Sequence, residues 1–418
     1  MHSRAVSETW SAAPAVLAEP DFFGLLDARP FAFLYGEGRF VVLAQEPLLT
    51  CGEDRLPTVA WERRGSVPPV LPDWIGFIGY GWGHRLEPLA GPARPTAFPF
   101  PDLRLTLHRE VRVYDRQTGL LYHGRREGLG PGSEEPSQLQ DGAFHAEKRW
   151  DSETAASYGA KVERIREAIA AGAVYQVNLT RQEGYGYAGD LRTFARRLWS
   201  ANPAPYSALL AEPEGTLISS SPECFLRVEE GWIETRPIKG TAPRHGDPEV
   251  DRALAEQLLA SAKNRSELAM IVDLLRNDLA QVCVLPEVEV TAFPELERYA
   301  NVHHLVATVR GRLRPGLELR ELLVALFPGG SVTGCPKLAA MDLIRELEPL
   351  GRGPYCGALG WLRQDLRQAH LALPIRTAFA DREQLAFGVG GGIVWDSEPT
   401  SEYEETVHKG RSLVACLR

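Results

Sequence analysis

One lysine, Lys239, stands in the segment TRPIKGTAPR (235–244) and suggests covalent chemistry. Only six of the 46 basic residues are lysines, so this chain normally uses arginine where a positive charge is needed. Arginine cannot lose its proton in a protein, whereas a lysine can be desolvated, deprotonated and made nucleophilic. Lys239 is therefore a candidate nucleophile. The alternative is an ordinary strand lysine with its ammonium group in solvent.

A carboxylate, Glu267, begins the segment ELAMIVDLLRNDL (267–279). Apolar residues recur there at helical spacing and predict a buried stripe of Leu268, Ile271, Val272, Leu275 and Leu279. Glu267 shares a flank with Ile271 and Leu274, so its carboxylate is expected to lean toward the core side. A solvated glutamate in the first turn of a helix remains the alternative.

Two further carboxylates, Glu402 and Glu405, occur in the C-terminal segment SEYEETVHK (401–409). At spacing i and i+3 they lie on one helix face and could together hold a hard cation. Mg²⁺ takes few carboxylates and keeps its other positions for water or substrate oxygens. Two structural interpretations compete: Ser401 with Glu404 fits a capping box, and Glu405 with Lys409 fits a surface ion pair.

Two glycine-rich segments differ in what they could bind. GVGGGI (388–393) offers backbone amides that could form an anion-binding nest or let a substrate approach the main chain, with a tight turn as the alternative. FPGGSVTGCPK (327–337) resembles a phosphate-binding loop, but Cys335 and Pro336 stand where the lysine would be needed. We therefore do not expect ATP binding.

Three other side chains could reach a site. His303 and His304 are neighbours on a predicted strand, so their rings face opposite sides and only one could enter a given site. A half-buried histidine without function is the alternative, and no HExxH-type metal spacing accompanies the pair. Arg376, among the strand formers of ALPIRTAFA (372–380), could present its guanidinium fork to a carboxylate.

Composition excludes several classes of protein. The formal net charge of −9 gives no basic field for nucleic acid. No apolar run approaches the roughly 18 residues of a membrane helix, and the N-terminus lacks the apolar core of a secretion signal. The six cysteines are scattered without a C-x-x-C pair, which argues against zinc or disulfides. We expect a soluble cytoplasmic protein without nucleic-acid or membrane partners.

The elements that must position these residues follow from pattern. Residues 126–147, rich in Gly, Pro, Ser and acid, predict a linker or surface loop between a β-rich part (1–125) and a mixed part (148–418). Helices are expected at 152–171, at 249–280 with a break near 262–265, at 336–348 and at 401–417. Strands are expected near 174–180, 216–220, 224–229, 232–238, 302–312, 356–362, 370–379 and 384–389. This order lacks regular βαβ alternation and predicts an α+β fold.

A collinear series of segments resembles the chorismate-utilising enzymes, and among them the component I subunits of aminodeoxychorismate synthases. The resemblance covers most of residues 150–418 and implies a large two-lobed β-sandwich-like core flanked by helices, with 148–418 as the chorismate-binding catalytic core. The segments are YQVNLT (175–180), SPECFL (221–226), RPIKGT (236–241), KNRSELAMIVDLLRNDL (263–279), NVHHLV (301–306), FPGGSVTGCPKLAAM (327–341), GPYCGALGW (353–361), PIRTA (374–378), GVGGGIVWDS (388–397) and EYEETVHK (402–409).

The resemblance implies roles around a chorismate site. Lys239, Glu223 and His304 match catalytic positions, with Glu223 as the acid that protonates the leaving hydroxyl. Arg376 and the glycine amides would hold the substrate's carboxylates. The matching substrate-binding residues are Gln176, Thr241, Ser331, Thr333, Tyr355, Arg376, Gly390, Gly391, Gly392 and Lys409.

The resemblance also implies Mg²⁺ as cofactor. Glu267 and Glu405 match direct ligands, and Glu402 matches a ligand that acts through water. The metal would grip the ring-bound carboxylate of chorismate and ease departure of the 4-hydroxyl. Asn264 stands where some relatives carry an acidic residue, so the outer shell of the metal departs from their pattern.

Two positions indicate the reaction. Gln176 stands where isochorismate and salicylate synthases carry a lysine base, and glutamine cannot take a proton from water. Anthranilate synthases read PIAGT where this chain reads PIKGT. In aminodeoxychorismate synthases that lysine is proposed to attack C2 and expel the 4-hydroxyl before ammonia adds at C4. The expected product is 4-amino-4-deoxychorismate, on the route to p-aminobenzoate and folate.

The partners expected from the resemblance are chorismate and a glutamine amidotransferase subunit, component II. The chain has no glutaminase motif, so ammonia is expected from that subunit. A separate lyase is expected to finish p-aminobenzoate, since the chain ends at Arg418. Two alternatives remain open: anthranilate synthase component I, which aminates C2 and loses pyruvate, and a non-catalytic regulatory protein with the same fold.

Overall fold

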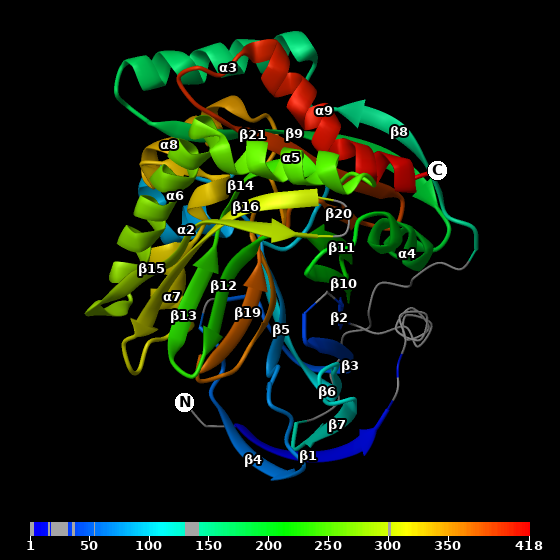
Figure 1. The fold of residues 1–418 in the computed structure, drawn as a ribbon. Coiled ribbons are helices and arrows are strands. Elements are labelled where there is room, and N and C mark those ends of the chain that lie inside the picture. The colour runs from blue at the N-terminus through cyan, green and yellow to red at the C-terminus, as the bar shows by residue number, and fades with distance from the viewer. Residues whose placement is uncertain are drawn as a thin grey trace.

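Strands and helices of this chain form a layered α+β molecule (Figure 1). The computed structural model describes residues 4–15, 17, 32–35, 38–53, 55–129, 142–299 and 302–418. The first strands are β1 (Arg4–Pro14), β2 (Ala32–Tyr35), β3 (Phe40–Cys51), β4 (Val59–Gly65), β5 (Trp74–Ile78), β6 (Leu103–Asp115) and β7 (Leu120–Glu127). The later strands are β8 (His145–Asp151), β9 (Gln176–Ala188), β10 (Tyr206–Glu212), β11 (Gly215–Ser221), β12 (Cys224–Glu229), β13 (Trp232–Arg236), β14 (Ile238–Pro243), β15 (Cys283–Arg298), β16 (Val302–Leu313), β17 (Gly334–Cys335), β18 (Ala358–Leu362), β19 (Gln368–Ala372), β20 (Thr377–Ala380) and β21 (Gln384–Ile393).

Strand β6 joins two layers of the sheet. Its residues 105–115 pair with β3, whereas its residues 103–106 pair with β5. From β3 the ladder continues through β2, β10, β11, β20, β21 and β9 to β8. From β5 it continues through β18, β19, β12, β13 and β16 to β15. The expected α+β fold with a two-lobed β core is confirmed.

Helices cover the outer faces of these layers. They are α2 (Trp82–Leu86), α3 (Ala155–Ala170), α4 (Leu191–Ala201), α5 (Pro248–Ala260), α6 (Ala262–Ala280), α7 (Leu319–Leu326), α8 (Lys337–Leu347) and α9 (Pro399–Cys416), with short 3₁₀ turns at Pro88–Ala90 and Gly330–Val332. In Figure 1, α3 and α9 lie side by side above β9 and β21, and the Tyr158 and Tyr403 rings meet between them. None of the helices in the described part of the chain combines the length and apolar character needed to cross a bilayer.

Helix α6 confirms the predicted apolar stripe. All five of its residues are buried, namely Leu268, Ile271, Val272, Leu275 and Leu279. Each such side chain contributes about 1.5–3 kcal/mol when fully buried, so this stripe fixes the helix against β15 and β16. The predicted break near 262–265 falls at Ser261, whose hydroxyl accepts a hydrogen bond from the backbone of Asn264.

Three local expectations need correction. The capping box of Ser401 is wrong, because α9 begins at Pro399, whose fixed φ suits a first helical position and leaves Ser401 inside the first turn. The expected strand 370–379 is split into β19 and β20, since Pro374 cannot donate to a ladder and Arg376 has a φ of +51°. The segment 388–393 is the end of β21 rather than a turn.

The expected linker 126–147 is described only at its ends. Strand β7 ends at Glu127 and β8 begins at His145, and residues 130–141 lie outside the described part of the chain. The early strands β2 and β5 pair with the later strands β10 and β18. The division into 1–125 and 148–418 stays a prediction.

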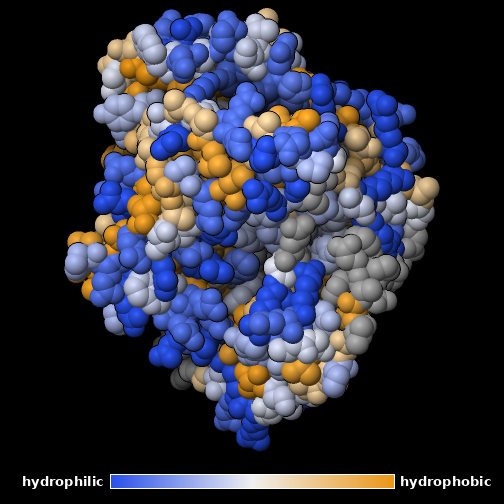
Figure 2. All heavy atoms as spheres, viewed as in Figure 1, coloured by the Kyte–Doolittle hydropathy of each residue, from blue (hydrophilic) through white to orange (hydrophobic). Residues whose placement is uncertain are grey.

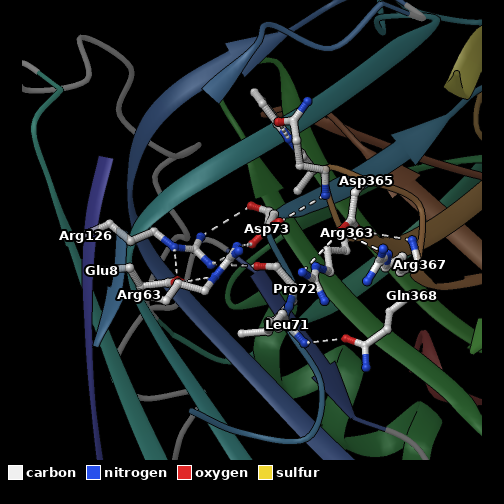
Figure 3. A network of polar contacts seen from close by, with 12 residues as sticks. Glu8, Arg63, Leu71, Pro72, Asp73, Arg126, Arg363, Asp365, Arg367 and Gln368 are labelled. Atoms are coloured by element: carbon white, nitrogen blue, oxygen red, sulfur yellow. Dashed lines mark hydrogen bonds and ion pairs between the residues drawn. The ribbon is translucent and has the colours of Figure 1, made fainter. Parts of the chain in front are cut away.

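A buried ionic network fastens the first strand to its neighbours (Figure 3). Glu8 on β1 lies 2.7 Å from Arg126 Nε on β7 and 2.6 Å from Arg63 Nε on β4. Arg63 also lies 2.5 Å from Asp73, which accepts a hydrogen bond from the backbone of Gln364. Glu8, Asp73 and Arg126 are fully buried and Arg63 is partly exposed, and the network connects β1, β4 and β7 to the β18–β19 link.

Candidate active site

Lys239 points into the molecule between β14 and β21. Its Nζ lies 3.4 Å from Glu267 Oε2, and the side chain is only 16% exposed. A Cβ added at Gly392 would lie 2.8 Å from this Nζ and 3.0 Å from Gln176 Nε2, so the three residues converge. The alternative of a solvent-directed lysine does not fit this placement.

A backbone irregularity aims Lys239 at this point. The pairing of β14 with β16 shifts register between Ile238 and Thr241, and Gly240 between them has a φ of +88°. A Cβ at Gly240 would approach Asn264 Nδ2 to 2.7 Å, so both the conformation and the space require glycine. Such a bulge re-aims the neighbouring side chain.

Glu223 is a buried carboxyl beside this lysine. Ser331 Oγ donates a hydrogen bond to Glu223 Oε1 at 2.7 Å, and the side chain is almost fully buried. Burial raises the pKa of Glu223 to about 7, and the opposing effects of Ser331 and Lys239 are smaller. The carboxyl can therefore hold a proton near neutral pH, as a general acid must.

His304 presents a free ring nitrogen. Its Nδ1 lies 2.9 Å from Thr241 Oγ1, and its buried Nε2 has no hydrogen-bond partner among the described residues. Burial, with a smaller contribution from Arg376, lowers the pKa of His304 to about 4, so the ring is neutral at physiological pH. His303 faces the other side, as predicted, with its Nε2 2.9 Å from Asp251.

Arg376 is a partly buried cation without an acidic partner among the described residues. It lies in the link between β19 and β20, and its guanidinium donates to Asn202 Oδ1 at 3.3 Å. No described carboxylate lies within ion-pair distance, and burial lowers the pKa of Arg376. A partly buried guanidinium without a carboxylate partner suits a ligand carboxylate. The sequence did not single out Asn202, which no local pattern marks.

The carboxylates of α9 meet at the glycine strand. A Cβ at Gly391 would lie 3.3 Å from Glu402 Oε2 and 3.4 Å from Glu405 Oε1. Ser397 Oγ donates to Glu402 at 2.6 Å. Lys409 Nζ lies 2.6 Å from Glu405, and the expected ion pair of Glu405 with Lys409 is therefore present. The predicted common face of the two glutamates is confirmed.

Opposite influences act on these two carboxyls. Burial raises the pKa of Glu402, and the nearby Glu405 adds to that effect. Desolvation also acts on Glu405, whose side chain is half exposed, but the charges of Lys409, Lys239 and Lys263 together outweigh it and the pKa of Glu405 is lowered. Lys409 Nζ further donates to the carbonyl of Gly390 at 2.9 Å.

The oxygen donors suit a hard cation. Glu267 on α6 faces Lys239 and Lys263, 3.4 and 4.0 Å away, while Glu402 and Glu405 converge from α9. Within the described ranges, no three His, Cys, Asp or Glu side chains are grouped closely enough to enclose a metal. Carboxylate oxygens are the donors that Mg²⁺ prefers, so the residue types fit that ion, but the structure does not bring the three glutamates together into one ligating group. The magnesium site stays a prediction.

The remaining predicted residues line the same region. Ser331 and Thr333 flank β9, because the backbone of Asn178 donates to the carbonyl of Thr333 at 2.8 Å. The ring of Tyr355 lies against Gly388, where a Cβ would approach it to 2.3 Å. Gln176 Oε1 is buried and has no partner in the described chain.

An anchor behind the site was missed from the sequence. Arg352 pairs with Glu348 and donates to the carbonyls of Val332, at 2.7 Å, and Asn178, at 2.6 Å. Both charged side chains are buried, so they hold the Ser331–Thr333 turn against β9. The i,i+4 spacing of Glu348 and Arg352 was the available signal, but Pro349 between them hid it.

A separate hollow of about 570 Å³ lies beside these residues, and the face in Figure 2 is hollowed near its middle. It is lined by parts of β2, β3, β12 and β19, and its walls include Tyr35, Phe40, Tyr206, Arg236, Tyr299 and His370. Tyr299 also touches His304, with ring centroids 5.6 Å apart. The hollow is therefore a neighbour of the candidate site rather than part of it.

Comparison with known proteins identifies the class that this fold and site define. Residues 47–415 match the family model described as chorismate binding enzyme. The chain belongs to this family, and it is a chorismate-utilising enzyme.

Individual relatives carry more than one activity in their names. The chain is 39% identical over 404 residues to aminodeoxychorismate synthase component 1 of Escherichia coli, covering 93% of this chain and 88% of that one. It is 38% identical over 343 residues to anthranilate synthase component 1 of Saccharolobus solfataricus, covering 82% and 80%. The crystal structure of anthranilate synthase component I from Streptococcus pneumoniae superposes with a TM-score of 0.77 at 28% identity, covering 91% and 93%.

Proposed function

We propose that this chain aminates chorismate at C4 with ammonia and releases 4-amino-4-deoxychorismate, as an aminodeoxychorismate synthase component I of the cytoplasm. The observation that carries the proposal is the position of Lys239, whose Nζ lies beside Gln176, Glu267 and the backbone of Gly392. A lysine there can reach a bound ring, whereas a glutamine at 176 cannot act as a base toward water. The names of several relatives support the same reaction.

The proposed first step forms a bond between the neutral Lys239 amine and C2 of chorismate. The two ring double bonds shift, the C4–O bond breaks, and the hydroxyl leaves as water with the proton of Glu223. A carboxyl whose pKa is raised to about 7 can supply that proton.

The proposed second step returns the two ring double bonds to their original positions. Ammonia attacks C4, the double bonds return, and the C2–N bond breaks to release Lys239. The incoming nitrogen loses a proton to Glu223, which restores the acid, so chorismate and ammonia give the amino product and water. Covalent catalysis of this kind divides one difficult substitution into two easier steps.

Other residues would hold the substrate. Arg376 would pair with a substrate carboxylate, and the neutral His304 would present Nε2 to a polar group of the ring. Mg²⁺, if held by Glu267, Glu402 and Glu405, would supply Lewis-acid polarisation of the ring carboxylate. The term component 1 in the relatives' names supports a partner that delivers ammonia, which we propose is a glutamine amidotransferase.

Anthranilate synthase is the second candidate, favoured by the similarity to the enzymes of that name. The two reactions differ in mass, because only amination at C4 retains the enolpyruvyl group. The test is to incubate the purified chain with chorismate, MgCl₂ and ammonium salt at mildly alkaline pH and to identify the product by mass spectrometry. Aminodeoxychorismate supports the proposal, anthranilate favours the second candidate, and no turnover favours a non-catalytic protein.

A further inference from the structure

The ring of His304 is held on two sides. Thr241 Oγ1 lies 2.9 Å from its Nδ1. The ring of Tyr299 meets it edge-on, with centroids 5.6 Å apart and an interplanar angle of 63°. These two contacts leave Nε2 as the nitrogen available to a ligand. The orientation of His304 therefore depends on what fixes Tyr299.

Tyr299 is anchored at three of its atoms. Its backbone N–H donates to the carbonyl of Val302 at 2.8 Å, and its carbonyl accepts from Arg244 at 2.8 Å. Its hydroxyl donates to Glu297 Oε2 at 2.7 Å, and the other oxygen of Glu297 pairs with Arg236. A tyrosine held at both its backbone and its hydroxyl has few conformations left.

Glu297 connects this anchor to the histidine strand. In the pairing of β15 with β16, Glu297 lies directly opposite His304. The Tyr299 hydroxyl thus reaches back to the residue that faces His304 across the ladder. Tyr299 therefore contacts His304 through its ring and, through its hydroxyl, contacts Glu297, the residue paired with His304.

The neighbouring hollow explains why the hydroxyl anchor is needed. Tyr299 and Arg236 both line this hollow of about 570 Å³. Packing on that side leaves space, so it does not confine the tyrosine ring. The hydrogen bond to Glu297 keeps the ring against His304 instead of letting it swing into the hollow.

We propose that Tyr299 is a positioning residue, which fixes the His304 imidazole through its ring edge and is itself fixed by the Glu297–Arg236 pair. The use of turnover as a readout rests on the proposed function. A misplacement of about 1 Å can cost about 100-fold in rate, so we expect Tyr299→Leu to lower kcat by about that factor. Tyr299→Phe keeps the ring but loses the anchor, and a fall of about 10-fold is expected. Since the proposal has Tyr299 act through His304 rather than on the substrate, KM should change far less than kcat.

The experiment has two readouts on Tyr299→Phe and Tyr299→Leu. The first is kcat and KM for chorismate with ammonium salt and MgCl₂. The second is the ¹⁵N resonances of His304 in histidine-labelled protein, assigned from their loss in His304→Gln. Tyr187→Phe is the matched control. The Tyr187 hydroxyl donates to the Asp381 carbonyl at 2.6 Å, and its strand β9 pairs with β8, β17 and β21 but not with β16, which carries His304.

The proposal is supported if kcat falls and the His304 resonances shift in both Tyr299 variants while Tyr187→Phe changes neither. It is overturned if kcat is unchanged, or if kcat falls while the His304 resonances stay in place. If Tyr299→Leu fails to fold, Tyr299→Phe decides alone. If the unmodified chain makes no aminodeoxychorismate, the proposed function fails, but the resonances still decide whether Tyr299 positions His304.

Discussion

Ser331 Oγ lies 2.7 Å from Glu223 Oε1 and donates the side-chain hydrogen bond that this buried carboxyl accepts. Burial nevertheless raises the pKa of Glu223 to about 7. If Glu223 is the acid, activity should fall as pH rises above about 7, because the proton is lost. Glu223→Gln should lower kcat by about 100- to 10,000-fold. A variant with unchanged kcat would exclude Glu223 as the proton donor.

Removing Ser331 should move this titration in a known direction. The hydrogen bond favours the charged carboxylate, so Ser331→Ala should raise the pKa of Glu223 further. The alkaline limb of the kcat/KM profile should then shift to higher pH. A shift to lower pH, or no shift with activity retained, would contradict the assignment.

The raised pKa of Glu223 also affects stability. Because the pKa is raised from 4.5 to about 7 in the folded state, Glu223 favours the folded state at low pH, and that contribution is lost as pH rises from about 4.5 through 7.

Lys239 should be irreplaceable if it forms a covalent bond. Lys239→Ala and Lys239→Arg should both lose C4 amination, since arginine keeps the charge but cannot become a free amine. Lys148→Arg, on β8 in an ion pair with Asp151, is the matched control and should stay active. Product formation is measured by mass spectrometry, and chorismate binding by calorimetry shows that the site is intact. Full activity of Lys239→Arg would refute the nucleophile.

Glu402 should affect metal affinity rather than folding. Glu402→Gln should raise the Mg²⁺ concentration for half-maximal activity by about 10- to 100-fold, as expected for a group that acts through bound water. Calorimetric titration with MgCl₂ alone gives a second readout that does not need turnover. Glu404→Gln, an exposed neighbour on the same helix, is the control. Equal Mg²⁺ affinity in the two variants would remove Glu402 from the metal site.

The buried ionic network should dominate the stability of the β1 region. Arg126→Met leaves Glu8 and Asp73 buried without one of their partners, which should cost about 3–5 kcal/mol. Arg64→Met breaks an exposed pair with Glu62 and should cost less than about 1 kcal/mol. Urea unfolding followed by circular dichroism compares the two. Equal losses would mean that the network does not carry the stability assigned to it.

Periodicity predicted the helices α3, α5, α6, α8 and α9 and the strands near 216–238 and 302–312, but it missed α4, α7 and the long strand β15. The α6 stripe and the shared face of Glu402 and Glu405 follow from helical spacing alone, and both are confirmed. Helix starts were less certain, because a proline competed with a capping pattern at the beginning of α9. Strand continuity failed at Pro374, where a short apolar run conceals a break.

The site itself could be predicted only as residues, not as contacts. Lys239, Gln176 and Gly392 come from three strands far apart in sequence, and no local pattern states that they converge. Arg352 and Tyr299 were missed because each acts through main-chain or ring contacts that depend on long-range pairing. The resemblance to the chorismate-utilising enzymes indicated the roles of the site residues, whereas the distances between them come from the fold.

The pairing of β5 with β18 joins residues 74–78 to residues 358–362. Strand β6 pairs with one edge of β5 and follows it soon in the chain, but the other edge of β5 has no partner until β18 is made nearly 300 residues later. Contacts so distant in sequence slow folding, because the entropy of closing a long loop is lost before the strand contacts can offset it. Until then β5 presents an unpaired apolar edge, which is a template for association with other chains. The pairing that joins the two layers thus leaves one apolar strand edge open throughout most of the synthesis of the chain.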